Sequence, residues 1–128
     1  MADRKPSVLI VDDVEIMREL LKAVLEKLDY EVVAQASDGR EGVDLAIALE
    51  PDLILLDVMM PIMNGYLALE EIIGRCVDPF VVMLSGVDDG KVVEQCILAG
   101  AQGFLQKADT EILVERLAKH RQTVVIPT

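Results

Sequence analysis

No apolar run in this sequence is long enough to cross a bilayer. Apolar residues make up 52% of its 128 residues, but charged residues interrupt them every few positions, and a membrane-spanning helix needs roughly 20 apolar residues in succession. The charged N-terminus, Met-Ala-Asp-Arg-Lys-Pro, is also unlike a cleaved secretory signal. These absences predict a soluble, cytoplasmic protein without membrane insertion.

Cysteine and basic residues are both scarce. The two cysteines, Cys76 and Cys96, lie in apolar helical patterns without metal-ligand spacing, which predicts buried free thiols. The 12 basic residues face 23 acidic ones, for a net charge of -11, and they form no stripe. Because such a charge repels a phosphate backbone, we expect no direct binding to nucleic acid.

Short apolar strands alternate with amphipathic helices along the whole chain. Strands are predicted over residues 7–11, 31–36, 53–56, 79–84 and 103–106. Helices are predicted over 14–28, from the turn at 37–39 to just before Pro51, from Asn64-Gly65 to about Arg75, and over 89–99 and 110–121. This alternation predicts a single α/β domain, a three-layer α/β/α sandwich around a five-stranded parallel sheet.

Polar residues with complementary chemistry follow four of the predicted strands. Asp12 and Asp13 follow the first, Asp57 the third, Ser85 the fourth and Lys107 the fifth. Because parallel strands end at one edge of their sheet, we expect these side chains to converge there. Three clustered carboxylates need a cation, and Mg²⁺ prefers such oxygen ligands. A nucleophilic carboxylate beside Mg²⁺, a lysine and a hydroxyl is a set suited to phosphoryl transfer.

Each of these residues also has a structural interpretation. Asp12 or Asp13 can cap the first helix, with Glu15 completing a capping box. Ser85 can be a turn residue, and Lys107 a solvated lysine. Asp57 is harder to explain structurally, because an aspartate at the end of an apolar strand must leave the core. The joint placement of all five residues favours the chemical interpretation.

These residues lie in motifs that resemble the response-regulator receiver family over essentially the whole chain. The motifs are Asp12-Asp13, residues 55–61 (LLDVMMP) with Asn64-Gly65, residues 84–86 (LSG) and residues 99–107 (AGAQGFLQK). The resemblance implies a CheY-like, flavodoxin-like sheet of strand order 2-1-3-4-5. It also implies a single receiver domain over residues 1–128, with no output domain visible in the sequence.

The resemblance assigns a role to each site residue. It makes Asp57 the phosphoacceptor in a two-component phosphorelay, with a sensor histidine kinase or a phosphotransfer protein as the donor. It makes Asp13, Asp57 and the Met59 backbone carbonyl direct ligands of Mg²⁺, and Asp12 a ligand acting largely through water. The domain is then a signalling switch, not an enzyme on other substrates.

Three further residues are implied in reading out the signal. Lys107 matches the lysine that contacts the phosphoryl group, Ser85 the switch hydroxyl, and Phe104 the aromatic side chain that turns inward. A downstream protein target is expected to bind the face built from the fourth helix, the fifth strand and the fifth helix. Val92, Phe104 and Gln106 lie on that face.

The sequence departs from the family pattern at several positions. Ala108 stands where many members have a proline, often with a cis bond, so the geometry of the Lys107–Ala108 peptide is open. Phe104 replaces the commoner tyrosine. Met59 and Val87, which flank the phosphoryl entrance in this alignment, are apolar. Since neither can orient a hydrolytic water, one interpretation is a long-lived phosphoryl group. The other is that both are loop residues that shield neighbouring apolar surface.

Two other functions use similar parts. Haloacid-dehalogenase-type phosphatases also combine an aspartate nucleophile with Ser or Thr, Lys and an acidic pair. Their nucleophile comes first, however, with a second aspartate two residues later, where this chain has Met59. The other alternative is a receiver-fold binding module that works without phosphorylation. The presence of all five site residues argues against it.

Overall fold

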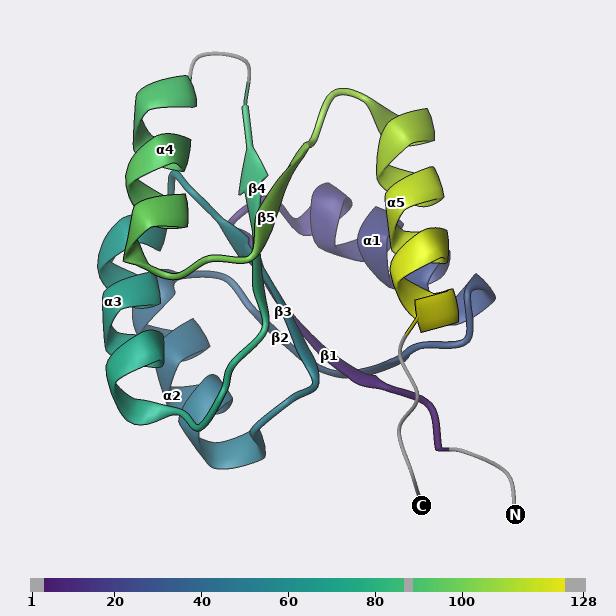
Figure 1. Ribbon diagram of the computed structural model, residues 1–128, viewed down its shortest axis with the longest axis horizontal. Coiled ribbons are helices and arrows are strands. Elements are labelled where there is room, and N and C mark those ends of the chain that lie inside the picture. The colour runs from purple at the N-terminus through teal and green to yellow at the C-terminus, as the bar shows by residue number, and fades with distance from the viewer. Residues whose placement is uncertain (1–3, 87–88, 124–128) are drawn as a thin grey trace.

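A computed structural model describes residues 4–86 and 89–123 and shows one parallel sheet of order β2-β1-β3-β4-β5 (Figure 1). Its central strands are apolar because both of their faces are covered. The predicted α/β sandwich and its strand order are therefore confirmed. The strands are β1 (Ser7–Val11), β2 (Glu31–Ala36), β3 (Leu53–Asp57), β4 (Val81–Ser85) and β5 (Gly103–Gln106).

Helices cover both faces of the sheet, and each face has its own apolar core. On one face, α2, α3 and α4 pack over side chains such as Leu9, Ile54 and Met83. On the other, α1 and α5 pack over Ile10 and Leu55. The helices are α1 (Glu15–Lys27), α2 (Gly39–Leu49), α3 (Gly65–Arg75), α4 (Gly90–Ala99) and α5 (Thr110–Thr123).

Several predicted boundaries are wrong by one or two residues. Strand β3 includes Asp57, which is paired in register with Leu84 of β4. Helix α5 continues two residues beyond Arg121. Strand β4 begins at Val81 and not at Pro79, since the side chain of Gln102 bonds to the chain there: Val81 N donates to Gln102 Oε1 (2.7 Å), and Gln102 Nε2 donates to the Pro79 carbonyl (3.1 Å).

The capping interpretation of the acidic pair is also wrong. Val14 is the N-cap residue of α1, and no side chain caps the helix. Asp12 Oδ1 accepts instead from Val14 N (2.8 Å), so it closes the turn before the helix. By contrast, Asp38 caps α2 by accepting from Glu41 N (2.8 Å), while Glu41 Oε1 accepts from Ser37 N (2.9 Å).

The cysteines differ in part from what the sequence predicts, and the peptide after Lys107 has the ordinary geometry. Both thiols are free, but only Cys96 is fully buried; Cys76 is half-buried, contrary to prediction. The Lys107–Ala108 peptide is trans, since no cis bond occurs in the described residues. None of the described helices combines the length and the apolar character that crossing a bilayer requires.

Candidate functional site

The carboxyl ends of β1, β3 and β4 bring polar side chains to one edge of the sheet. Asp12, Asp57 and Ser85 are all buried there, each exposed by 3% or less, whereas Asp13 is exposed. Strand pairing sets their positions, with Asp57 beside Leu84 and Ser85 beside Gln106. Since β5 ends at Gln106, the same register places Lys107 at this edge. The predicted convergence of five residues is thus present.

The three carboxylates form a compact cluster. One oxygen from each of Asp12, Asp13 and Asp57 lies within 4.8 Å of the other two. Lys107 supplies a cation to it: Nζ lies 2.9 Å from Asp12 Oδ2 and 3.1 Å from Asp57 Oδ2. One ammonium group therefore faces two buried carboxylates, and a third carboxylate lies beside them. This leaves an excess of negative charge that a divalent cation would neutralise.

Burial dominates the protonation of Asp57. Loss of solvation, followed by the nearby charge of Asp12, raises the pKa of Asp57 to about 7, although Lys107 opposes the shift. For Lys107, burial alone lowers the pKa, but the hydrogen bonds to Asp12 and Asp57 outweigh it and the pKa is raised. A strand-end carboxyl group with such a perturbed pKa is typical of a functional site.

Neighbouring backbone groups hold the acidic residues in place. Asp12 N donates to the Ala36 carbonyl (3.0 Å), and Arg18 Nη1 donates to the Asp12 carbonyl (2.8 Å). On the other side, Gly65 N donates to the Val58 carbonyl (2.8 Å), and a Cβ at Gly65 would overlap the backbone of Asp57. Glycine at position 65 is therefore required for α3 to begin this close to the strand.

The structure adds Arg18, whose contact sequence reasoning missed. Its guanidinium reaches back from the first turn of α1 to the end of β1. The spacing in the sequence could have indicated this contact, since Arg18 stands six residues after Asp12 and one helical turn beyond Val14. Its bond to the Asp12 carbonyl helps to fix the backbone at the end of β1.

Ser85 and Phe104 lie around one hollow. The Ser85 hydroxyl donates to the Leu105 carbonyl over 3.4 Å, longer than an ordinary O–H···O bond. The Phe104 side chain is 40% exposed. A hollow of about 320 Å³ lies between β4, β5 and the start of α4, and its walls are Ser85, Gly86, Gly90, Val93, Glu94, Phe104 and Gln106. The aromatic ring thus has space beside it into which it can turn.

The remaining predicted residues lie around the cluster. Met59 follows β3, and its side chain is 61% exposed. Because Mg²⁺ prefers oxygen ligands to a thioether, the backbone carbonyl of Met59 is the group that could serve a metal. Val92 is half-buried and Gln106 exposed, as a contact face requires. Val87 lies outside the described residues. The expected long lifetime of the phosphoryl group stays a prediction.

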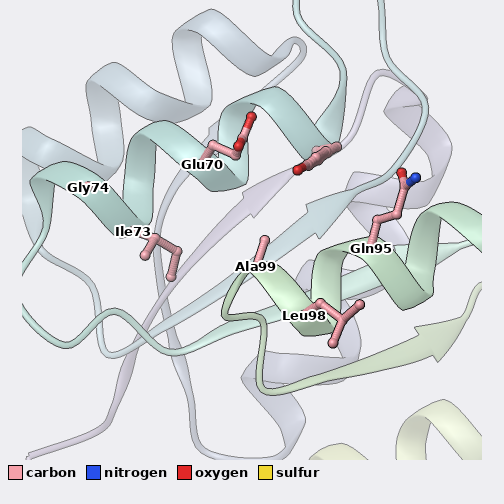
Figure 2. A pocket seen from close by; sticks show the side chains of 7 residues that line it. Glu70, Ile73, Gly74, Gln95, Leu98 and Ala99 are labelled. Atoms are coloured by element: carbon pink, nitrogen blue, oxygen red, sulfur yellow. The ribbon is translucent and has the colours of Figure 1, made fainter.

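A second hollow lies away from the strand ends. A groove of about 550 Å³ runs between α3 and α4, lined in part by Glu70, Ile73 and Leu98 (Figure 2). None of the converging polar residues lines it. It is therefore not part of the acidic site.

Comparison with known proteins agrees with this geometry. Residues 8–118 match the family described as the response regulator receiver domain. The chemotaxis protein CheY of Thermotoga maritima is 39% identical over 100 residues, which cover 78% of this chain and 83% of that protein. The transcriptional regulatory protein LiaR of Bacillus subtilis is 44% identical over 101 residues, which cover 78% of this chain but only 48% of LiaR.

Solved structures show the same fold. The response regulator domain of Thermotoga maritima CheB has a TM-score of 0.82 at 31% identity, covering 94% of this chain and 98% of that one. A chain of the Borrelia burgdorferi CheX–CheY complex with BeF₃ and Mg²⁺ has a TM-score of 0.78 at 27% identity, covering 89% and 90%. Nothing in these likenesses favours a phosphatase or a phosphorylation-independent module. The chain belongs to the response regulator receiver domain family and is a phosphorylation switch of two-component signalling.

Proposed function

We propose that Asp57 is the residue that accepts the phosphoryl group. The observation that carries this proposal is the position of its carboxylate, at the end of a central strand and in contact with Lys107 over 3.1 Å. An oxygen of Asp57 attacks the phosphorus of a phosphohistidine, and the bond from phosphorus to the imidazole nitrogen breaks. Lys107 is already placed to bind a phosphoryl oxygen through its ammonium group.

The acidic cluster fits a divalent cation, and we propose that this is Mg²⁺. Asp13, Asp57 and the Met59 backbone carbonyl would hold it directly, and Asp12 largely through water. When bound, the ion lowers the pKa of Asp57 and neutralises charge on the phosphoryl oxygens. The chain's own contribution is the burial of Asp12 and Asp57 and the hydrogen bond that holds Asp12 at Val14 N.

Readout is proposed to begin at Ser85. Its bond to the Leu105 carbonyl is long and easily given up, so the hydroxyl can turn to a new acceptor oxygen on Asp57. Phe104 then turns into the hollow beside Ser85. This changes the surface of α4, β5 and α5, where Val92 and Gln106 also lie, and hence its affinity for a downstream protein.

The donor is a sensor histidine kinase or a phosphotransfer protein, and this domain acts in the cytoplasm. The domain catalyses only its own phosphorylation and dephosphorylation. The chain binds no nucleic acid directly, in keeping with its net charge of -11. That it is one receiver domain over residues 1–128 stays a prediction.

The test is intact-mass analysis after incubation with a small acyl-phosphate donor and Mg²⁺. The wild type is expected to gain one phosphoryl group, and Asp57→Asn and Asp13→Ala to gain none. A third variant, Asp44→Asn, removes an exposed carboxylate of α2 far from the cluster and is the matched control. An adduct that persists undiminished in Asp57→Asn would disprove the assignment.

A further inference from the structure

The groove between α3 and α4 has two unlike walls. Glu70 and Ile73 stand on the α3 wall, and Gln95, Leu98 and Ala99 on the α4 wall (Figure 2). Polar ends lie toward one end of the groove and apolar side chains toward the other. Its volume, about 550 Å³, exceeds what a single side chain fills. A groove between two neighbouring surface helices has the shape that receives a third helix.

Two of the lining residues are not explained by the stability of the fold. Gly74 lies in the last turn of α3 without a positive φ, and a Cβ there would meet no atom within 4 Å, so the local backbone does not require glycine. A larger side chain would therefore fit. Leu98 is 89% exposed and buries almost nothing. The glycine keeps the groove open, and the leucine presents apolar surface at its rim.

The charge of the groove is negative. Among the residues that the structure describes, Glu70 is the one ionised residue that lines the groove, and no basic side chain lines it. The Glu70 carboxylate lies near enough to the Tyr66 hydroxyl to raise its pKa. Glu94 is exposed just before Gln95. The nearest guanidinium at the end of α3, that of Arg75, already pairs with Glu71 (3.7 Å).

From this shape, charge and pattern of exposure, we infer that the α3–α4 groove is a docking site for a basic amphipathic helix of a partner protein. Apolar side chains of that helix lie against Leu98 and Ile73, above Gly74. A lysine or arginine of the helix lies beside Glu70. The groove shares none of its lining with the strand-end cluster, so the unphosphorylated protein already presents it.

The probe is a synthetic helix of about 15 residues, with leucine at positions i, i+3, i+4 and i+7 and arginine elsewhere. It is titrated into ¹⁵N-labelled protein, as wild type and as Asp57→Asn. Saturable amide shifts are expected at Ile73, Gly74, Leu98 and Ala99 in both proteins. Replacing the arginines by glutamates should weaken binding by at least about tenfold. Shifts spread over all acidic surfaces would overturn the inference.

Variants separate docking from general attraction. Leu98→Lys and Gly74→Leu should each weaken binding about tenfold, with unchanged or higher melting temperatures. Ile16→Lys is the matched control, since Ile16 is 77% exposed and lies on α1, over the opposite face of the sheet. It should leave binding unchanged. Equal losses in Leu98→Lys and Ile16→Lys would refute the site, and so would unfolding of Gly74→Leu.

Discussion

Asp12 and Asp57 are two buried carboxylates that share the single ammonium group of Lys107. The fold holds them close although each would be better solvated apart, and the raised pKa of Asp57 is the result. Asp13 contributes less to this repulsion, because it is exposed. We propose that cation binding and phosphoryl transfer both depend on this excess of negative charge.

Removing the charge of Asp57 should therefore stabilise the metal-free protein. Its pKa is 3.8 when unperturbed and about 7 in the folded state, so the folded protein binds more protons between these values. Stability then falls as the pH rises through that window. At pH 8, Asp57→Asn should raise the free energy of unfolding by about 1–3 kcal/mol.

The measurement is urea unfolding of the wild type and Asp57→Asn in metal-free buffer at pH 8 and pH 5. The gain of the variant should shrink at the lower pH, where the wild-type carboxyl group is already largely protonated in the folded state. Asp13→Asn serves as the control and should show a smaller gain. A variant less stable than the wild type at pH 8 would be incompatible with strain at this carboxylate.

At the scale of elements, local patterns predicted most of what is seen. Apolar runs bounded by aspartates predicted β1 and β3, and the period of Leu21 and Leu25 predicted α1. The start of β4 was not predictable, since it depends on Gln102, whose side chain comes from 21 residues away in the chain. Such long-range side-chain bonds leave no trace in a local pattern.

The candidate site was only partly predictable from the sequence. Which residues meet follows from strand order, because the end of each parallel strand lies at one edge. How they meet does not: the bonds of Lys107 to both Asp12 and Asp57, and the turn that Asp12 closes at Val14, depend on side-chain directions. Because Asp12 closes that turn, neither Asp12 nor Asp13 caps α1, contrary to the structural interpretation of this pair.

Helix α5 is attached at its C-terminal end by a buried polar contact. The Tyr30 hydroxyl lies 2.8 Å from the Leu117 carbonyl and 2.8 Å from His120 Nδ1. A carbonyl only accepts, so Tyr30 donates to Leu117 and neutral His120 donates from Nδ1. The His120 ring also packs against Phe80 at 5.0 Å between centroids. Protonating Nε2 would keep the Nδ1 donor but would place a charge on a partly buried ring, so it should weaken the attachment of α5.

Burial lowers the pKa of His120. The unfolded chain then binds the proton more readily, so this residue's contribution to stability is present above about pH 6.5 and is lost as the pH falls below it. The decline in melting temperature between pH 7 and pH 5 should be smaller in His120→Gln than in the wild type. Because the chain has one histidine, its NMR titration is unambiguous. A pKa above 6.5 would contradict the prediction.

At the scale of the whole molecule, the sheet separates two cores and joins one site to one surface. The strand-end cluster lies where β1 and β3 end, and the pairing of β4 with β5 places Gln106 beside Ser85 and Phe104 beside Met83. The hollow next to Ser85 touches both β5 and α4. A change at Asp57 can thus reach the surface of α4, β5 and α5 through a few adjoining residues.

The most direct test of this account is an amide chemical-shift map of the protein before and after phosphorylation by an acyl-phosphate donor with Mg²⁺. The account predicts large changes at Asp57 and Ser85 that extend to Val92, Phe104 and Gln106, and that are absent from Asp57→Asn. Changes confined to the surroundings of Asp57, with α4 and β5 unaltered, would contradict it.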